Sequence, residues 1–376
     1  MNKIKIATVF GTRPEATKMA PLVKLFALDP RIRSLVCVTG QHRQMLDQVL
    51  NKLDILPDHD LNIMRHSQTL EYVTSRVLEG LSAVLAEEKP DLVLVHGDTT
   101  TAFAGCLAAF YNKIPVGHVE AGLRTFDKYF PFPEEMNRKL VDAMADLYFC
   151  PTSGNRDNLL REGVPADRIW VTGNTAIDFL RYTAKDPYVF QCGPLNNEDY
   201  SGKRVLAVEI HRREILGQPI RHILKALRKI AEEYSDVRII WPVHLHPEVK
   251  TPAREILGDV PNVLLLEPVD VFDMHNLLRR SYLVFTDSGG LQEEAPSLGA
   301  PVLVARRETE RQEAVDAGTV RLAGTEYNGV YDSLKCLLDS PDEHAAMVRS
   351  ANPYGDGRAA EKIRDAVFKY FGIVPE

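Results

Sequence analysis

Short apolar segments alternate with longer segments of helical periodicity along the whole chain, and this alternation restricts the fold more than any other feature. KIKIATVF (3–10), DLVLVHG (91–97) and DLYFCPT (146–152) are apolar at nearly every position, and helical segments such as 15–28 separate them. Strands that are apolar on both faces are typical of parallel sheets covered by helices on both sides. The pattern therefore predicts an α/β fold built on parallel sheets.

The length of 376 residues suggests two domains. The alternation pauses in a polar stretch over 186–203, which we interpret as a linker or surface loop, and restarts at 204. We expect two Rossmann-like β/α/β domains that face a cleft, spanning residues 1–172 and 173–357. Ligands of open parallel sheets bind beyond the carboxyl ends of the strands, so the residues after each strand are the candidates for chemistry.

The charge balance excludes some classes of protein. Lys and Arg number 45 against 52 Asp and Glu, a net charge of −7, which argues against general nucleic-acid binding. No segment approaches the roughly 18 apolar residues that span a membrane, and the N-terminal segment does not read as a signal peptide. The five cysteines form no C-x-x-C pair. We therefore expect a cytoplasmic protein with reduced thiols and no membrane insertion.

Charged residues follow several predicted strands of the first half. Arg13 lies in a turn that opens a helix, where it could bind a phosphate or be a surface arginine; the two interpretations are about even. Asp98 could cap the next helix, and for this residue alone capping is favoured. Glu120 follows another strand, and Glu134 lies in the first turn of a helix, where acidic residues often only complement the dipole. Three carboxylates at neighbouring strand ends could nevertheless divide acid and base roles.

The second half offers two more candidates. His211 follows the segment 204–210 and could donate to a phosphate or transfer a proton, or could belong to a solvated basic turn. The segment TDSGGLQEE (286–294) suits a pyrophosphate at a helix start, with a glutamate available for ribose hydroxyls. His244 and His246 lack a third ligand, so we expect no metal site.

A series of motifs then identifies a family. They occur in the order GTRPEATKMAP, QHRQMLDQVL, HGDTTT, GHVEAGLRT, PFPEEMNR, TGNT, HRRE, TDSGGLQEEAPSLG, TERQEAVDAGT and NPYGDG. This series resembles the non-hydrolysing UDP-N-acetylglucosamine 2-epimerases of bacteria and covers nearly the whole chain. The resemblance implies the two-domain GT-B architecture, a homodimer, and a C-terminal helix, within 358–376, that packs back on the first domain.

The resemblance also implies roles for individual residues. The catalytic positions are Asp98, Glu120, Glu134 and His211. The substrate-binding positions are Arg13, Lys18, Arg138, Ser288, Gly289, Gly290 and Glu294. A regulatory site for a second substrate molecule is implied at Gln41, His42 and Gln44, although the arginine expected near position 67 is Ser67. Further departures from the family pattern are Glu209, Ile215, Met274 and Gln312, which bear on substrate preference and efficiency.

The implied activity is the reversible epimerisation of UDP-N-acetylglucosamine at C2 to UDP-N-acetylmannosamine, which feeds cell-surface polysaccharides. The C2 proton is not next to a carbonyl, and no G-x-G-x-x-G follows the first strand, so we expect no redox cofactor. Elimination of UDP, followed by its re-addition, needs only two proton-handling groups and cations at the diphosphate. The alternatives are a GT-B glycosyltransferase, a hydrolysing 2-epimerase and a non-catalytic nucleotide-sugar sensor.

Overall fold

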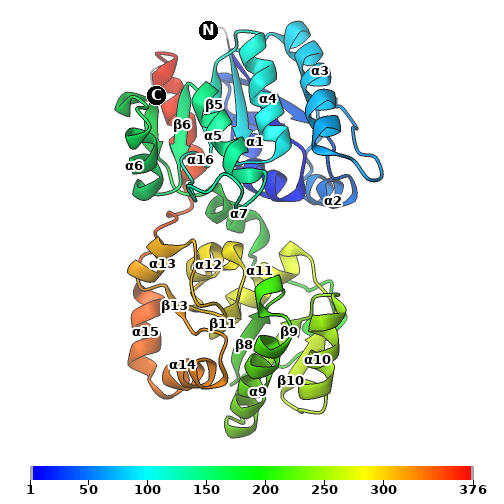
Figure 1. Ribbon diagram of the computed structural model, residues 1–376, viewed down its shortest axis with the longest axis vertical. Helices are drawn as coiled ribbons and strands as arrows, with labels where there is room; N and C mark the ends of the chain where they lie inside the picture. The colour runs from blue at the N-terminus through cyan, green and yellow to red at the C-terminus, as the bar shows by residue number, and fades with distance from the viewer. Residues whose placement is uncertain (1–2, 374–376) are drawn as a thin grey trace. The chain divides into compact units, whose positions relative to one another are not determined.

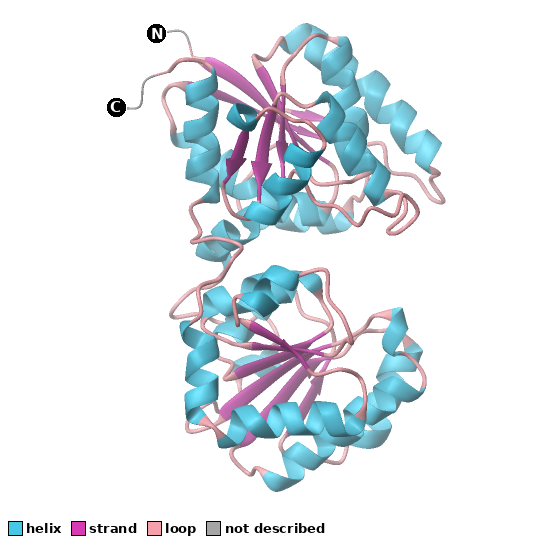
Figure 2. Cartoon of the chain, turned by 60° about the vertical axis from the view of Figure 1, so that its left-hand side comes forward, coloured by secondary structure: helices cyan, strands magenta, loops and turns pink. Residues whose placement is uncertain are grey.

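The computed structural model describes residues 3–373, which form two compact units (Figure 1). One unit holds the chain up to Phe179 and again from Tyr354, and the other holds Leu180–Pro353. Each unit is a parallel β-sheet between helices, so the predicted α/β fold with two Rossmann-like units is confirmed (Figure 2).

The first unit is built on a sheet of strand order β3-β2-β1-β4-β5-β6-β7, and all of its strand pairs are parallel. Its strands are β1 (Ile4–Phe10), β2 (Ile32–Val38), β3 (His59–Asp60), β4 (Leu92–His96), β5 (Val116–Val119), β6 (Leu147–Cys150) and β7 (Ile169–Val171). Its helices are α1 (Arg13–Leu28), α2 (Gln44–Lys52), α3 (Leu70–Glu88), α4 (Thr100–Tyr111), α5 (Glu134–Met144), α6 (Ser153–Arg161), η1 (Ala166–Arg168) and α16 (Ala359–Tyr370). β4, β5 and β6 are buried along their whole length, as their apolar sequences require.

The second unit has a sheet of strand order β10-β9-β8-β11-β12-β13, again parallel throughout. Its strands are β8 (Arg204–Glu209), β9 (Val237–Pro242), β10 (Val263–Leu266), β11 (Leu283–Thr286), β12 (Val302–Val304) and β13 (Val320–Leu322). Its helices are α8 (Gly193–Asn196), η2 (Arg213–Ile215), α9 (Gln218–Glu233), α10 (Pro247–Leu257), α11 (Val271–Arg279), α12 (Gly289–Glu294), η3 (Ala295–Leu298), α13 (Gln312–Asp316), α14 (Tyr327–Asp339) and α15 (Pro341–Arg349).

Hydrogen bonds hold the C-terminal segment in the first unit. The carboxylate of Asp178 accepts the backbone N–H groups of Ala359 and Ala360, which open α16, at 3.0 and 2.8 Å. The N–H of Asn174 donates to the carbonyl of Tyr354 at 2.7 Å. Helix α16 packs against α1 in the same unit. Helix α7 (Thr175–Thr183) carries the chain from the first unit into the second.

The polar stretch 186–203 is part of the second unit. Its backbone N–H groups at Gln191 and Cys192 and the hydroxyl of Tyr188 all donate to the carboxylate of Asp273 on α11, at 2.8–3.0 Å. Asp273 is buried, so these bonds anchor the stretch to the unit. Of the two predicted alternatives, linker and surface loop, the structure shows a loop segment that includes the short helix α8 and is fixed to the second unit. Helix α7 connects the two units.

Candidate active site

The first candidate residues lie at the carboxyl ends of β4 and β5, which pair in the sheet. Asp98 follows β4 after Gly97, and Glu120 follows β5 directly. Both turns use left-handed backbone: φ is 64° at Gly97 and 69° at Glu120. Such a φ is unfavourable for a residue with a side chain and is typical of functional sites. The two turns are close together, since a Cβ on Gly97 would lie 3.4 Å from Oε2 of Glu120.

Asp98 does not cap a helix, so the interpretation that was favoured for this residue alone is wrong. Thr99 is the N-cap of α4, and its hydroxyl accepts the N–H of Ala102 at 2.9 Å. The carboxylate of Asp98 instead lies 2.5 Å from the guanidinium of Arg138 on α5, whose neighbour Asn137 donates to the Asp98 carbonyl at 2.9 Å. The predicted substrate-binding Arg138 is therefore the ionic partner of a predicted catalytic carboxylate.

Glu120 is surrounded by groups that stabilise its ionised form. Lys18 Nζ on α1 lies 2.5 Å from Oε1, and His96 Nε2 at the end of β4 lies 3.1 Å from Oε2. Asn174 also donates to Oε1 at 3.3 Å. Burial alone would raise the pKa of the Glu120 carboxyl, but the charges of Lys18 and His96 outweigh it and hold this pKa well below its ordinary value.

A cavity of about 380 Å³ lies in the first unit beside these residues. Arg13, Gln41, His42, Asp98 and Glu134 are among the residues that line it. Oε2 of Glu134 is inaccessible to solvent and has no hydrogen-bond partner among the described residues. The cavity thus brings together two predicted catalytic carboxylates, one predicted substrate-binding arginine and two residues of the predicted regulatory set. Gln44, the third of that set, begins α2 and does not line the cavity.

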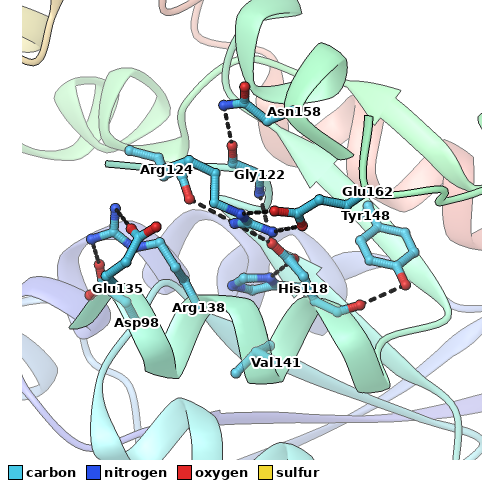
Figure 3. A network of polar contacts seen from close by, with 12 residues as sticks. Asp98, His118, Gly122, Arg124, Glu135, Arg138, Val141, Tyr148, Asn158 and Glu162 are labelled. Atoms are coloured by element: carbon cyan, nitrogen blue, oxygen red, sulfur yellow. Dashed lines mark hydrogen bonds and ion pairs between the residues drawn. The ribbon is translucent and has the colours of Figure 1, made fainter. Parts of the chain in front are cut away.

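A buried polar network supports the turns that carry Asp98 and Glu120 (Figure 3). His118 on β5 is fully buried; its Nε2 lies 2.8 Å from the carbonyl oxygen of Gly97, and its Nδ1 lies 2.5 Å from Asp142 on α5. Arg124 lies 2.8 Å from the same carboxylate. Burial alone would raise the pKa of Asp142, but His118 and Arg124 lower it overall.

In the second unit, His211 lies beyond the end of β8, next to two carboxylates. Its Nδ1 is 2.5 Å from Glu209 and 3.7 Å from Asp287. Oδ2 of Asp287 accepts the N–H groups of His211 and Arg212 at 2.9 and 2.8 Å, which fixes this turn. The Glu209 carboxylate raises the pKa of the His211 imidazole, while partial burial opposes the shift.

The predicted nucleotide-binding segment begins a helix of the second unit. Ser288 is the N-cap of α12, and Gly289 and Gly290 form its first turn. A Cβ on Gly289 would lie 2.7 Å from the guanidinium carbon of Arg311, whereas one on Gly290 would meet nothing closer than 3.9 Å. Glu294, at the end of the helix, has its Oε2 3.2 Å from Nε2 of the buried His275 on α11.

The departures from the family pattern have different surroundings. Ile215 in η2 is fully buried in the core of the second unit, so its apolar side chain is part of the packing. Met274 is half-buried on α11. Ser67 adopts a φ of 55°, and its hydroxyl lies 2.8 Å from Nδ1 of His66.

One group of side chains could hold a metal ion. Among the described residues, Glu209, His211 and Asp287 offer ligand atoms that all lie within 4.8 Å of one another. The sequence-based search missed it because it considered only His244 and His246. These two histidines follow β9 instead of lying on it: His246 is the N-cap of α10, and the ring of His244 stacks on that of His211.

His96, His118 and Asn174 were not predicted as site residues, although each lies inside one of the family motifs. Their polar side chains gave no signal of their own, because a histidine within an apolar strand is usually a satisfied core residue. These residues can be recognised as part of the site only once the order of β4, β5 and β6 in the sheet is known, because that order determines which strand ends are neighbours.

Comparison with known proteins shows the family to which the fold belongs. The sequence model of the UDP-N-acetylglucosamine 2-epimerases matches residues 26–367. A UDP-N-acetylglucosamine 2-epimerase of Bacillus subtilis is 53% identical over 376 residues, 100% of this chain and 98% of that protein. A crystal structure of a UDP-N-acetylglucosamine 2-epimerase superposes with a TM-score of 0.93 at 51% identity, covering 100% of this chain and 98% of the other. The Neisseria meningitidis UDP-GlcNAc 2-epimerase bound to UDP-GlcNAc gives a TM-score of 0.86 at 44% identity, covering 97% and 100%.

Fold and site together define an α/β enzyme of two Rossmann-like units that has clustered charged side chains at its strand ends. The chain belongs to the UDP-N-acetylglucosamine 2-epimerase family, as its sequence motifs predicted.

Proposed function

We propose that this chain epimerises UDP-N-acetylglucosamine at C2, giving UDP-N-acetylmannosamine, by eliminating and re-adding UDP. The observation that supports this most is the environment of Glu120. Lys18 and His96 keep Glu120 in the ionised form, the only form of a carboxyl group that can accept a proton, although the same charges weaken it as a base. The turn that holds Glu120 adjoins the turn of Asp98. Asp98 and Glu134 line the neighbouring cavity.

The elimination begins with cleavage of the C1–O bond, whose electron pair leaves with UDP. C1 becomes electron-poor, which acidifies the proton at C2. A carboxylate removes this proton, and the C2–H electron pair forms the C1–C2 double bond of a glycal. The re-addition reverses these events: a diphosphate oxygen of UDP attacks C1, and C2 takes a proton on its other face. The reaction is redox-neutral, and it needs proton-handling groups on both faces of the sugar.

In this proposal the first unit handles protons and the sugar. Asp98, Glu120 and Glu134 are the acid and base groups, and Arg13, Lys18 and Arg138 are substrate-binding residues. The ion pairs Arg138–Asp98 and Lys18–Glu120 support it, because each places a proposed substrate-binding cation directly beside a proposed catalytic carboxylate. Gln41, His42 and Gln44 are proposed as a regulatory site.

The second unit binds UDP in this proposal. His211 faces the diphosphate, Ser288, Gly289 and Gly290 surround it at the start of α12, and Glu294 binds ribose hydroxyls. The bond between Glu294 and the buried His275 supports the last role, since it fixes the carboxylate in one orientation. Structures of relatives hold UDP-GlcNAc, and one holds both UDP-GlcNAc and UDP.

We further propose a homodimer that acts in the cytoplasm. No helix among the described residues is long and apolar enough to cross a membrane. Sedimentation of the purified protein tests the dimer, and a monomer at micromolar concentration contradicts it.

Incubation of the protein with UDP-N-acetylglucosamine alone tests the activity. We expect the NMR signals of substrate and C2 epimer to reach constant proportions, approached from either nucleotide sugar. Unlimited release of UDP and free sugar would instead mean a hydrolysing enzyme. An unchanged substrate would mean a transferase that requires an acceptor, or a protein that only binds.

A further inference from the structure

Two neighbouring strands of the second unit bring a histidine and two carboxylates together. Glu209 ends β8, His211 lies two residues beyond it, and Asp287 follows the end of β11. β8 and β11 pair in parallel, with Thr286 opposite Glu209. Because the register is fixed by the sheet, the three side chains converge without the help of a mobile loop. Nδ1 of His211 lies 2.5 Å from Oε1 of Glu209 and 3.7 Å from Oδ1 of Asp287.

Each carboxylate of this group has one oxygen held by the protein and one directed at His211. Oε2 of Glu209 accepts the hydroxyl of Thr286 at 3.1 Å. Oδ2 of Asp287 accepts the backbone N–H groups of His211 and Arg212. Metal-binding carboxylates are oriented in this way, by hydrogen bonds to the oxygen that does not face the metal.

The oxygen of Asp287 that faces His211 lacks a hydrogen bond. The Asp287 side chain is fully buried, and its Oδ1 has no hydrogen-bond partner among the described residues. Nδ1 of His211 is also inaccessible to solvent and has no partner of hydrogen-bond geometry, despite the nearby Glu209 oxygen. A buried carboxylate oxygen without a partner is costly, and a coordinated cation would satisfy it together with the imidazole nitrogen.

We propose that Glu209, His211 and Asp287 form a binding site for a divalent transition-metal ion, with Zn²⁺ as the preferred ion. One imidazole nitrogen and two carboxylate oxygens suit Zn²⁺, whereas Mg²⁺ takes oxygen ligands. The side chains of His211 and Glu209 are 38% and 20% exposed, so water reaches the rim of the site, while Nδ1 of His211 and Oδ1 of Asp287 are themselves inaccessible to solvent. Three protein ligands would leave the fourth position of a tetrahedral ion to water, as in non-structural zinc sites.

The site has a consequence for the proposed UDP binding. A bound cation would neutralise the Glu209 carboxylate and occupy the imidazole expected to face the diphosphate. The metal site itself depends on ligand geometry alone and stands whether or not the chain epimerises a nucleotide sugar.

Calorimetric titration of the chelator-treated protein with ZnCl₂, without nucleotide, tests the site. We expect one equivalent to bind, and Co²⁺ added in its place to give visible absorption bands of a nitrogen- and oxygen-ligated ion. Glu209→Gln and Asp287→Asn keep the side-chain shapes and should each weaken binding on the order of tenfold to a hundredfold or more, since even outer-shell partners contribute that much.

The matched control is His222→Gln. His222 forms a pair with Glu326 in the same unit at 3.1 Å, without a third ligand, and its loss should leave Zn²⁺ binding unchanged. Circular dichroism of every variant checks folding; if Asp287→Asn is unfolded, Glu209→Gln decides the question. Wild-type protein that binds no stoichiometric Zn²⁺ overturns the proposal. Equal binding by the wild type and a folded Glu209→Gln variant also overturns it.

Discussion

Nε2 of His118 lies 2.8 Å from the carbonyl oxygen of Gly97, and this contact joins the carboxyl ends of β4 and β5. Gly97 directly precedes Asp98, and His118 lies two residues before Glu120. One imidazole therefore fixes the spacing of the two turns that carry these proposed catalytic carboxylates. Its other nitrogen faces Asp142, which makes the ring a rigid connection.

Replacing His118 should therefore impair turnover more than folding. We expect His118→Asn to lower kcat for UDP-N-acetylglucosamine by about tenfold or more, with a smaller change in KM. The reason is that misplaced acid and base groups stabilise the transition state less well, while substrate binding is less affected. Steady-state kinetics measure the effect. Tyr148→Phe is the control: it removes a hydroxyl that donates to the Asp142 and Ala145 carbonyls, costing about 1 kcal/mol of stability, and should leave kcat nearly unchanged. Equal loss of kcat in both variants would reduce His118 to a structural residue.

Lys18 should control the pH dependence of the reaction. Its ammonium lowers the pKa of Glu120, whereas burial raises it, so Lys18→Met should raise this pKa. The acidic limb of the kcat/KM profile should then move to higher pH. Lys24→Met, on the same helix, is the matched control and should keep the wild-type profile. An unshifted acidic limb in Lys18→Met would mean that Glu120 is not the group that titrates there.

The same ionisation affects stability. The pKa of Glu120 is lower in the folded protein than in the unfolded chain, so its ionised form stabilises the fold at pH values above the unfolded pKa. This contribution is lost as the pH falls through the folded pKa. In Lys18→Met the raised pKa should shift that loss to higher pH, and urea unfolding between neutral and acidic pH measures the difference.

Ile215 should matter for folding and not for substrate preference. Its side chain is fully buried, so Ile215→Asn puts an amide into the core of the second unit and should cost about 3 kcal/mol. Thermal unfolding measures the loss. Arg213→Asn, an exposed neighbour in η2, is the control and should cost less than about 0.5 kcal/mol. An Ile215→Asn variant of wild-type stability would show that the turn rearranges to accept a polar residue.

The fold could be predicted because it follows from a pattern that most of the strands repeat, although the short polar strand β3 does not. β4 and β6 are buried on both faces, as their apolar sequences indicate. The individual roles at strand ends were harder to predict. Asp98 and Thr99 are both good N-caps, and only the backbone of the turn decides that Thr99 takes this position and leaves Asp98 to Arg138.

Interactions between distant segments could not be read from one sequence. Glu209 and Asp287 are separated in the sequence by a stretch that includes β9 and β10. They meet because β11 pairs with β8 as far as Glu209, whereas the pairing of β9 with β8 ends at Ala207. The partners of Glu120 similarly come from α1, β4 and the turn after β7. Spacing along the chain carries no information about either group, because strand order decides which ends are adjacent.

Turnover of UDP-N-acetylglucosamine in deuterium oxide tests the elimination route most directly. If a carboxylate removes the C2 proton and C2 is reprotonated from a group that exchanges with solvent, the UDP-N-acetylmannosamine formed should carry deuterium at C2. At equilibrium the remaining UDP-N-acetylglucosamine should carry it as well. ¹H NMR of the two nucleotide sugars measures the loss of the C2 proton signal. Product that forms at the same rate and keeps its original C2 proton would contradict the proposed mechanism.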